Sequence, residues 1–254
     1  MGVRMNRQII LDEMIAEYEK EFKGWDFSYL NGKWEESKEP WNYRQIVEEA
    51  LKGKNTLLDL GTGGGEFLSS LQNLPQTVYA TEGYEPNFQI AEDRLKKLGI
   101  TVKFITDNEI PYDSEQFDIV INKHESYEPA EVHRVLKNNG IFITQQVGGL
   151  NDCNLNSIFK SDLSEYRDWE LFAAVKALEE QGFSIERRQE SFGYTRFFEA
   201  KSLVYYLKCI PWQIKGFSVM RYAEPLLSLH SYIDENGFID LIKHRFLIIT
   251  KKLG

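Results

Sequence analysis

A glycine-rich turn between an apolar run and a helical pattern is the feature that most constrains this chain. Leu57, Leu58 and Leu60 form a short apolar run, which is typical of a buried strand. Glycines follow this run at positions 61, 63 and 65, and a helical pattern begins at Glu66. A strand, a glycine turn and a helix in this order are typical of the ligand-binding corner of a doubly wound α/β sheet.

The glycine spacing argues against a dinucleotide at this corner. The dinucleotide pattern G-x-G-x-x-G requires a third glycine at the position where Glu66 stands. A carboxylate there would repel a diphosphate at the helix N-terminus, which otherwise attracts anions. The spacing therefore disfavours a nicotinamide-dependent oxidoreductase.

Acidic residues mark the ends of three expected strands. Asp59 lies in the first strand, Glu82 follows the strand Thr77–Thr81, and Asp107 follows the strand Val102–Thr106. An acid about 20 positions beyond the glycines is placed to accept hydrogen bonds from two ribose hydroxyls. Each acid alone also fits an ordinary cap or turn residue, but the three together favour a nucleoside-like ligand.

The pattern acidic-x-Gly-x-Gly-x-Gly, from Asp59 to Gly65, resembles the first motif of type 11-like class I S-adenosylmethionine-dependent methyltransferases. The stretch Val135–Gly140 is similar to the Leu-Lys-Pro-Gly-Gly element of that family, with two asparagines in place of Pro-Gly. The resemblance covers about residues 42–190 and the final strand, and it implies S-adenosylmethionine as the cofactor. It implies cofactor-binding roles for Asp59, Gly61, Thr62, Gly63, Gly65, Glu82, Gly83, Asp107, Asn108 and Asn122.

Strands and helices alternate along the chain, which predicts an α/β fold with a mainly parallel sheet. The expected helices cover residues 8–22, 42–52, 86–97, 129–137 and 168–181. The further expected strands are Phe117–Ile121, Gly140–Gln146, Phe183–Gln189 and Arg245–Thr250. The family resemblance implies a Rossmann-like, doubly wound, seven-stranded sheet whose last strand is antiparallel and lies beside the sixth.

Three regions are expected from the spacing of these elements. Residues 1–41 form an N-terminal helix and an aromatic lid segment, and residues 42–190 with 238–254 form the cofactor-binding domain. Residues 191–237 are inserted between strands six and seven and contain ten aromatic residues. Two interpretations stay open: an accessory core layer, or a cap that covers the substrate site together with the aromatic N-terminal segment.

The acceptor is expected beyond the carboxyl ends of strands four and five. His124 follows strand four and is the candidate base, because imidazole titrates near neutral pH. A hydrogen-bonded structural histidine is the alternative. Glu125 can orient His124 or bind substrate, although its position favours a solvated loop carboxylate over either role. Gln145 and Gln146 end strand five and can line the same cleft.

Several kinds of site are disfavoured by missing motifs. The sequence after strand four lacks the (Asn/Asp)-Pro-Pro-(Tyr/Phe) motif of amino-group methylation of nucleobases and glutamine. Cys153 and Cys209 are isolated, so they form neither a C-x-x-C metal pattern nor a Pro-Cys pair. No metal site is predicted, and two isolated cysteines fit a reducing cytoplasm.

Charge favours a small acceptor. The chain has 30 Lys and Arg against 39 Asp and Glu, a net charge of −9, whereas nucleic-acid binding usually requires a basic surface. No apolar run approaches the ~20 residues of a membrane span, so no membrane partner is expected. The prediction is an enzyme that methylates oxygen or nitrogen of a small molecule. One alternative is an RNA methyltransferase, whose basic patch would come from Arg187-Arg188 or from the group Lys243, Arg245, Lys251 and Lys252. The other alternative is a non-catalytic S-adenosylmethionine-binding regulatory protein.

Overall fold

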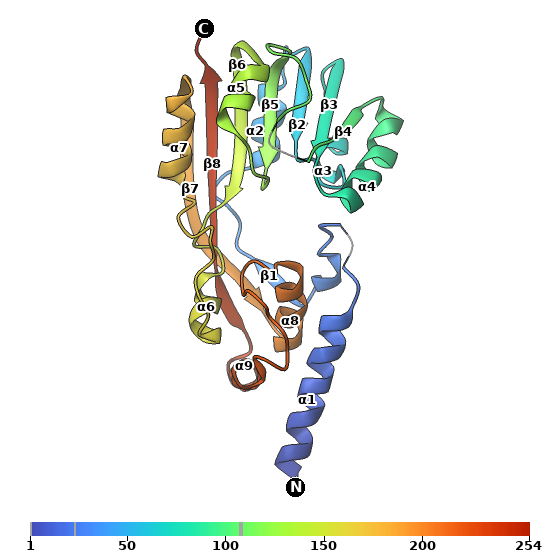
Figure 1. Cartoon of the computed structure of the whole chain (residues 1–254), viewed down its shortest axis with the longest axis vertical. Coiled ribbons are helices and arrows are strands. Elements are labelled where there is room, and N and C mark those ends of the chain that lie inside the picture. Colours follow the sequence, from blue (N-terminus) through green and yellow to red (C-terminus); the bar gives the residue numbers. More distant parts are fainter. Residues whose placement is uncertain (1, 23, 107–108) are drawn as a thin grey trace. The chain divides into compact units, whose positions relative to one another are not determined.

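The computed structural model describes residues 2–22, 24–106 and 109–254, which divide into two compact units (Figure 1). The first unit comprises Met1–Glu39, Gly148–Asp168 and Ser191–His244. The second unit comprises Pro40–Val147, Trp169–Glu190 and Arg245–Gly254. The two longest strands of the structure contribute residues to both units. The predicted region boundaries and the cap role of residues 191–237 stay predictions.

In the described part of the chain, eight strands form one sheet in the order β1-β7-β8-β6-β5-β2-β3-β4. Their bounds are β1 Trp34–Glu36, β2 Thr56–Leu60, β3 Thr77–Glu82, β4 Thr101–Phe104, β5 Phe117–Lys123, β6 Leu136–Val147, β7 Phe183–Phe197 and β8 Ile239–Lys252. Strands β2 to β6 pair in parallel, and β8 is antiparallel to β6, with Thr144 opposite Ile248. The predicted Rossmann-like α/β fold and its antiparallel last strand are confirmed.

Strand β1 was not predicted and makes the sheet one strand wider than expected. It is antiparallel to β7, with Glu35 opposite Arg196. Its three residues lie in an aromatic segment that the sequence pattern marks as irregular. A strand this short has no readable alternation, so its pairing with a distant strand decides its conformation.

The helices of the described residues are α1 Gly2–Glu19, α2 Tyr43–Ala50, α3 Glu66–Ser69, α4 Glu85–Leu95, α5 Pro129–Val135, α6 Cys153–Phe159, α7 Leu171–Glu180, α8 Ala200–Cys209 and α9 Ala223–Asn236. Two short 3₁₀ helices cover Ser28–Leu30 and Lys96–Leu98. No helix within the described ranges is both long and apolar enough to cross a membrane.

The second unit has three layers, because both faces of its sheet are buried under helices. Leu57 belongs to a core that includes Val47 of α2 and Ala91 of α4. Leu58 belongs to a separate core with Val132 of α5 and Val175 and other residues of α7. Successive residues of a strand point to opposite faces, so a strand covered on both sides reads as a continuous apolar run.

The first unit has a core of its own, built mainly from α1, α8 and α9. Leu11 and Met14 of α1 pack in one cluster with Leu203 of α8 and Leu226 of α9. Phe197 at the end of β7 is fully buried in the same cluster. The aromatic residues of the N-terminal segment and of 191–237 therefore include members of a packed core.

Helix α5 ends two residues earlier than predicted. Leu136, expected in the helix, is extended and pairs with Phe117 of β5, and it is fully buried. Asn139 adopts a left-handed conformation with φ of 63°. Burial of Leu136 in the β5–β6 ladder outweighs its helix propensity, which is a weak local preference.

Strands β7 and β8 are longer than predicted. β7 continues past Gln189 to Phe197, and β8 begins at Ile239 and not at Arg245. Gly193 lies within β7, and a Cβ at this position would collide with the side chain of Ser37. The glycine therefore permits a close approach between two chain segments and does not end the strand.

Candidate functional site

The glycine turn after β2 is tied to the neighbouring strand β3. The backbone N–H of Thr62 donates to the carbonyl of Thr81 at 2.9 Å, and the N–H of Gly61 donates to the Thr81 hydroxyl at 3.3 Å. Gly63 has φ of 62°, and a Cβ added there would meet no atom within 4 Å. The left-handed backbone favours glycine at Gly63, and the space beside it is open to a ligand.

Asp59 is a buried carboxylate in β2, two residues before Gly61. It is 4% exposed and accepts a hydrogen bond from the Thr62 hydroxyl. Burial raises the pKa of Asp59 to about 6, the negative charge of Glu82 adds to this, and Thr62 and Lys123 oppose it. Asp59 therefore carries a charge at neutral pH that the protein only partly neutralises.

Glu82, the last residue of β3, contacts the glycine turn. It is 3% exposed and accepts backbone N–H bonds from Gly63 at 2.6 Å, Gly83 at 3.0 Å and Tyr84 at 2.8 Å. Burial raises the pKa of Glu82, the negative charge of Glu125 raises it further, and the three N–H bonds oppose this shift. Gly83 thus directs its N–H toward Glu82.

The side chain of Glu125 lies against Gly61 of the glycine turn. A Cβ at Gly61 would overlap the Cβ and Cγ atoms of Glu125, so the glycine lets the loop after β5 approach the turn. The negative charge of Glu82 raises the pKa of Asp59, and the negative charge of Glu125 raises the pKa of Glu82. A site with this excess of negative charge fits a cationic ligand such as a sulfonium compound with an ammonium group, and it disfavours a diphosphate.

Asn122 is fully buried between three strands. Its side-chain nitrogen donates to the carbonyl of Leu60 at 3.0 Å, and its oxygen accepts from Thr144 at 3.0 Å and Gln146 at 2.6 Å. Gln146 also donates to the carbonyl of Glu125 at 3.0 Å. These bonds fix the carboxyl ends of β2, β5 and β6 relative to one another. The predicted contact of Asn122 with the cofactor stays a prediction.

His124 is held at both its backbone and its ring. Its backbone has φ of 64°, and its N–H donates to the carbonyl of Gln145 at 2.8 Å. Its Nε2 lies 2.9 Å from the side-chain nitrogen of Gln145. The oxygen of the same Gln145 side chain accepts a bond from the indole N–H of Trp41 at 2.8 Å. Trp41 was not predicted as a site residue, although it falls in the expected lid segment.

Asp107 and Asn108 lie outside the described residues.

Asn87 lies in the first turn of α4 and was not predicted as a site residue. It is fully buried, and neither polar atom of its side chain has a hydrogen-bond partner among the described residues.

No group of three or more His, Cys, Asp or Glu in the described ranges is arranged to hold a metal ion.

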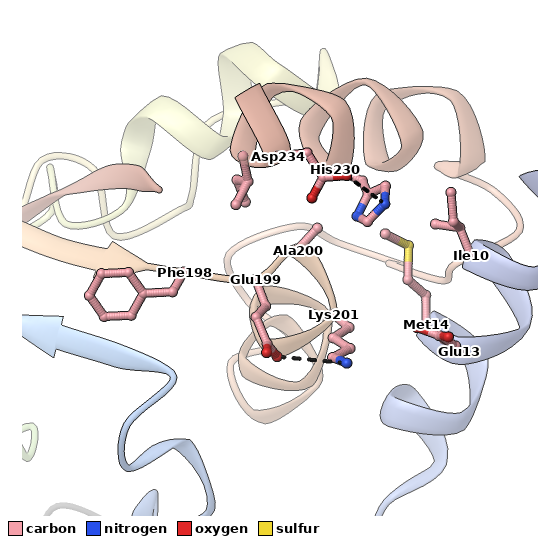
Figure 2. Close-up of a pocket in the computed structure, with 10 residues that line it drawn as sticks. Ile10, Glu13, Met14, Phe198, Glu199, Ala200, Lys201, His230 and Asp234 are labelled. Carbon is pink, nitrogen blue, oxygen red and sulfur yellow. Dashed lines mark ion pairs between the residues drawn. The ribbon is translucent and has the colours of Figure 1, made fainter. Parts of the chain in front are cut away.

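A cavity of about 200 Å³ lies in the first unit, between α1, α8 and α9 (Figure 2). Figure 2 shows two ion pairs in its wall, between His230 and Asp234 at 3.3 Å and between Lys201 and Glu199 at 3.9 Å. Its described lining is Ile10, Glu13, Met14, Phe198, Glu199, Ala200, Lys201, His230, Ile233 and Asp234. This lining includes no residue that the sequence marks as catalytic or cofactor-binding.

Residues 58–144 match a family model described as a methyltransferase domain. The chain contains a methyltransferase domain. The matched residues run from β2 to β6 and include the glycine turn, Glu82 and His124. The predicted family and its cofactor, S-adenosylmethionine, are confirmed at the level of this methyltransferase domain.

A protein-L-isoaspartate O-methyltransferase from Chlorobaculum parvum is 29% identical to this chain over 142 residues. The match covers 54% of this chain and 64% of that relative. The chain therefore matches less than two thirds of the relative's length.

Solved structures share the fold of the methyltransferase domain. A candidate methyltransferase from Bacillus halodurans has a TM-score of 0.61 at 20% identity, covering 84% of this chain and 99% of its own. A candidate sarcosine dimethylglycine methyltransferase from Galdieria sulphuraria has a TM-score of 0.52 at 18% identity, covering 82% of each chain. The [4+2]-cyclase SpnF has a TM-score of 0.53 at 17% identity, covering 83% of this chain and 80% of its own. At these identities the likeness shows the fold alone.

Proposed function

We propose that this protein binds S-adenosylmethionine at the glycine turn after β2 and transfers its methyl group to an oxygen or nitrogen atom of a small organic acceptor. The observation that carries this proposal is the group formed by Asp59, Glu82 and Glu125 around a turn with open backbone at Gly63. Asp59 and Glu82 are buried and Glu125 is exposed, and their negative charge favours a cationic ligand without a phosphate.

Each residue of the turn has a separate role in this proposal. The charge of Asp59 attracts the ammonium group, and Gly63 allows the amino-acid tail to lie against the backbone. Glu82 already accepts three N–H bonds, and a carboxylate offers about four acceptor positions, so it retains capacity for a ribose hydroxyl. When bound, S-adenosylmethionine supplies an electrophilic methyl group on a positively charged sulfur.

The acceptor binds beyond the carboxyl ends of β5 and β6, where His124, Glu125 and Gln145 lie. A small molecule is favoured over RNA because the chain has a net charge of −9, whereas RNA binding gains affinity from Lys and Arg contacts to phosphate. The protein's part in the reaction is to align the acceptor and exclude water.

Calorimetric titration with S-adenosylmethionine and S-adenosylhomocysteine tests the cofactor site. We expect Gly63→Val to abolish binding of both, because it strains the backbone and fills the open space. Gly53→Val is the matched control, since Gly53 also has positive φ, 72°, and open space around it, but lies before β2. Equal affinities of Gly63→Val and wild type would overturn the proposal.

A second experiment tests the reaction. Incubation with methyl-labelled cofactor and a cell extract, followed by separation into metabolite, RNA and protein fractions, should place the label in the metabolite fraction. Label in the RNA fraction would instead support the RNA methyltransferase. Cofactor binding without any transferred label would support the non-catalytic regulatory protein.

A further inference from the structure

The side chain of Gln145 has only one orientation that satisfies both of its neighbours. The indole N–H of Trp41 is a donor and has no acceptor capacity. The Gln145 atom that faces it at 2.8 Å must therefore be the amide oxygen. A flipped amide would place an N–H₂ group against the indole N–H, with no hydrogen bond.

This orientation determines the protonation of the His124 ring. The Gln145 side-chain nitrogen faces Nε2 of His124 at 2.9 Å and can only donate. Nε2 must then accept, which requires its lone pair, and the single proton of the neutral ring lies on Nδ1. An imidazolium, or the other neutral tautomer, would place an N–H against the amide N–H₂ and lose this bond.

We propose that Trp41 and Gln145 hold His124 as the neutral Nδ1–H tautomer, so that His124 is a positioning residue and not the base that removes a proton from the acceptor. The nitrogen that a base would use is engaged by Gln145. The backbone N–H of His124 also donates to the backbone carbonyl of Gln145. His124 and Gln145 are therefore joined by one backbone and one side-chain hydrogen bond.

The consequence for the acceptor rests on the proposed methyl transfer. An alcohol needs a base to remove its proton, whereas a carboxylate brings an available lone pair at neutral pH. Methylation of a carboxylate forms a C–O bond and breaks the C–S bond, giving an ester and a neutral thioether with no proton to remove. We therefore assign the acceptor to groups that bring an available lone pair without a base, such as a neutral amine or a carboxylate, and not to an alcohol.

Nitrogen-15 NMR of the ligand-free protein tests the tautomer independently of methyl transfer. The protein has four histidines, and His124→Asn identifies the signals of His124. We expect a protonated Nδ1 and an unprotonated Nε2. His244 is an internal control with the opposite pattern, because its Nδ1 faces the backbone N–H of Leu150 at 3.3 Å.

Two substitutions test the cause. Trp41→Phe removes the donor that orients Gln145, so the Nε2–H tautomer of His124 should become populated while His244 stays unchanged. Gln145→Glu places acceptors against Nε2, which should become protonated. Trp212→Phe is the matched control, since Trp212 lies in the first unit, and should leave His124 as in wild type. An Nε2–H tautomer in wild type, or no change in Trp41→Phe, would overturn the assignment.

The labelled metabolite tests the acceptor class. A methyl ester releases volatile labelled methanol in mild base, whereas a methyl ether or methylamine does not. Release of the label as methanol, or its identification in a methylamine, supports the assignment, whereas a methyl ether formed from an alcohol overturns it. If no labelled product forms and calorimetry detects no cofactor binding, the proposed function is wrong. The NMR result for the tautomer of His124 does not depend on that outcome.

Discussion

The hydroxyl of Thr62 donates a hydrogen bond to Asp59, with 2.7 Å between the two oxygens. Asp59 is nevertheless strained electrostatically, because burial, with the charge of Glu82, raises its pKa to about 6. The hydrogen bond from Thr62 lowers the pKa but does not offset burial. A carboxylate kept charged in this way at the base of the glycine turn lowers stability while providing attraction for a cation.

The first prediction concerns the stability of the ligand-free protein. The folded pKa of Asp59 lies above its ordinary value of 3.8, so the folded state binds the proton more tightly. Its contribution to the free energy of unfolding should therefore rise as the pH falls from about 6 to about 4. Asp59→Asn should raise the free energy of unfolding at pH 7 by about 2–3 kcal/mol and remove this pH dependence. Urea unfolding at pH 7 and pH 4.5 measures both effects, and lower stability of the variant at pH 7 would contradict the prediction.

The second prediction concerns affinity for S-adenosylmethionine. Protonation of Asp59 removes the charge that attracts the ammonium group, so the affinity should fall as the pH drops through about 6. The decrease should approach tenfold per pH unit at most. Calorimetry between pH 5 and pH 8 measures it. Thr62→Ser keeps the hydroxyl and should behave as wild type, whereas Asp59→Asn should bind weakly at every pH. A pH-independent affinity of the wild type would refute the role of Asp59.

The third prediction concerns the N–H bonds that Glu82 accepts. Glu82→Gln replaces one acceptor oxygen by an N–H₂ group that would face backbone N–H donors. We expect a loss of about 2 kcal/mol in the free energy of unfolding and weaker cofactor binding. Glu85→Gln makes the same change at an exposed position in the first turn of α4 and should alter neither property. Chemical unfolding and calorimetry on both variants decide the outcome.

The fourth prediction compares two fully buried asparagines. Asn87 has no hydrogen-bond partner among the described residues, so Asn87→Leu should raise the free energy of unfolding by about 1–2 kcal/mol. The amide of Asn122 has three partners, and Asn122→Leu should lower the same quantity by about 3 kcal/mol or more, because it leaves the carbonyl of Leu60 without its donor. Thermal unfolding monitored by circular dichroism gives both changes. Destabilisation by both substitutions would show that the amide of Asn87 is satisfied in solution.

Much of the second unit could be predicted because its signals are local in the sequence. The run at Leu57 is apolar on both faces, the glycines are spaced for a turn, and Glu82 ends a strand of β-branched and apolar residues. Asp59 and Thr62 are only three positions apart, so their contact follows from the turn itself. The first strand, the turn and the start of α3 at Glu66 therefore agree with the sequence pattern.

The ends of several elements could not be predicted because distant pairing determines them. Leu136 leaves α5 to pair with Phe117, and β7 continues through Gly193 because a second segment packs closely there. Strand β1 exists through its pairing with β7. At these element ends the local sequence does not favour one backbone conformation strongly. Contacts with distant parts of the folded chain therefore decide the conformation.

The sequence alone determined the type of domain, the glycine turn after β2 and the positions of the acids Asp59 and Glu82, because these depend on residue spacing along short stretches of the chain. Only the tertiary structure decided what His124 can do. Its partner Gln145 is oriented by Trp41, which lies 104 positions away from Gln145 in the sequence. No local pattern encodes a hydrogen bond across that separation, yet this bond places the proton on the ring.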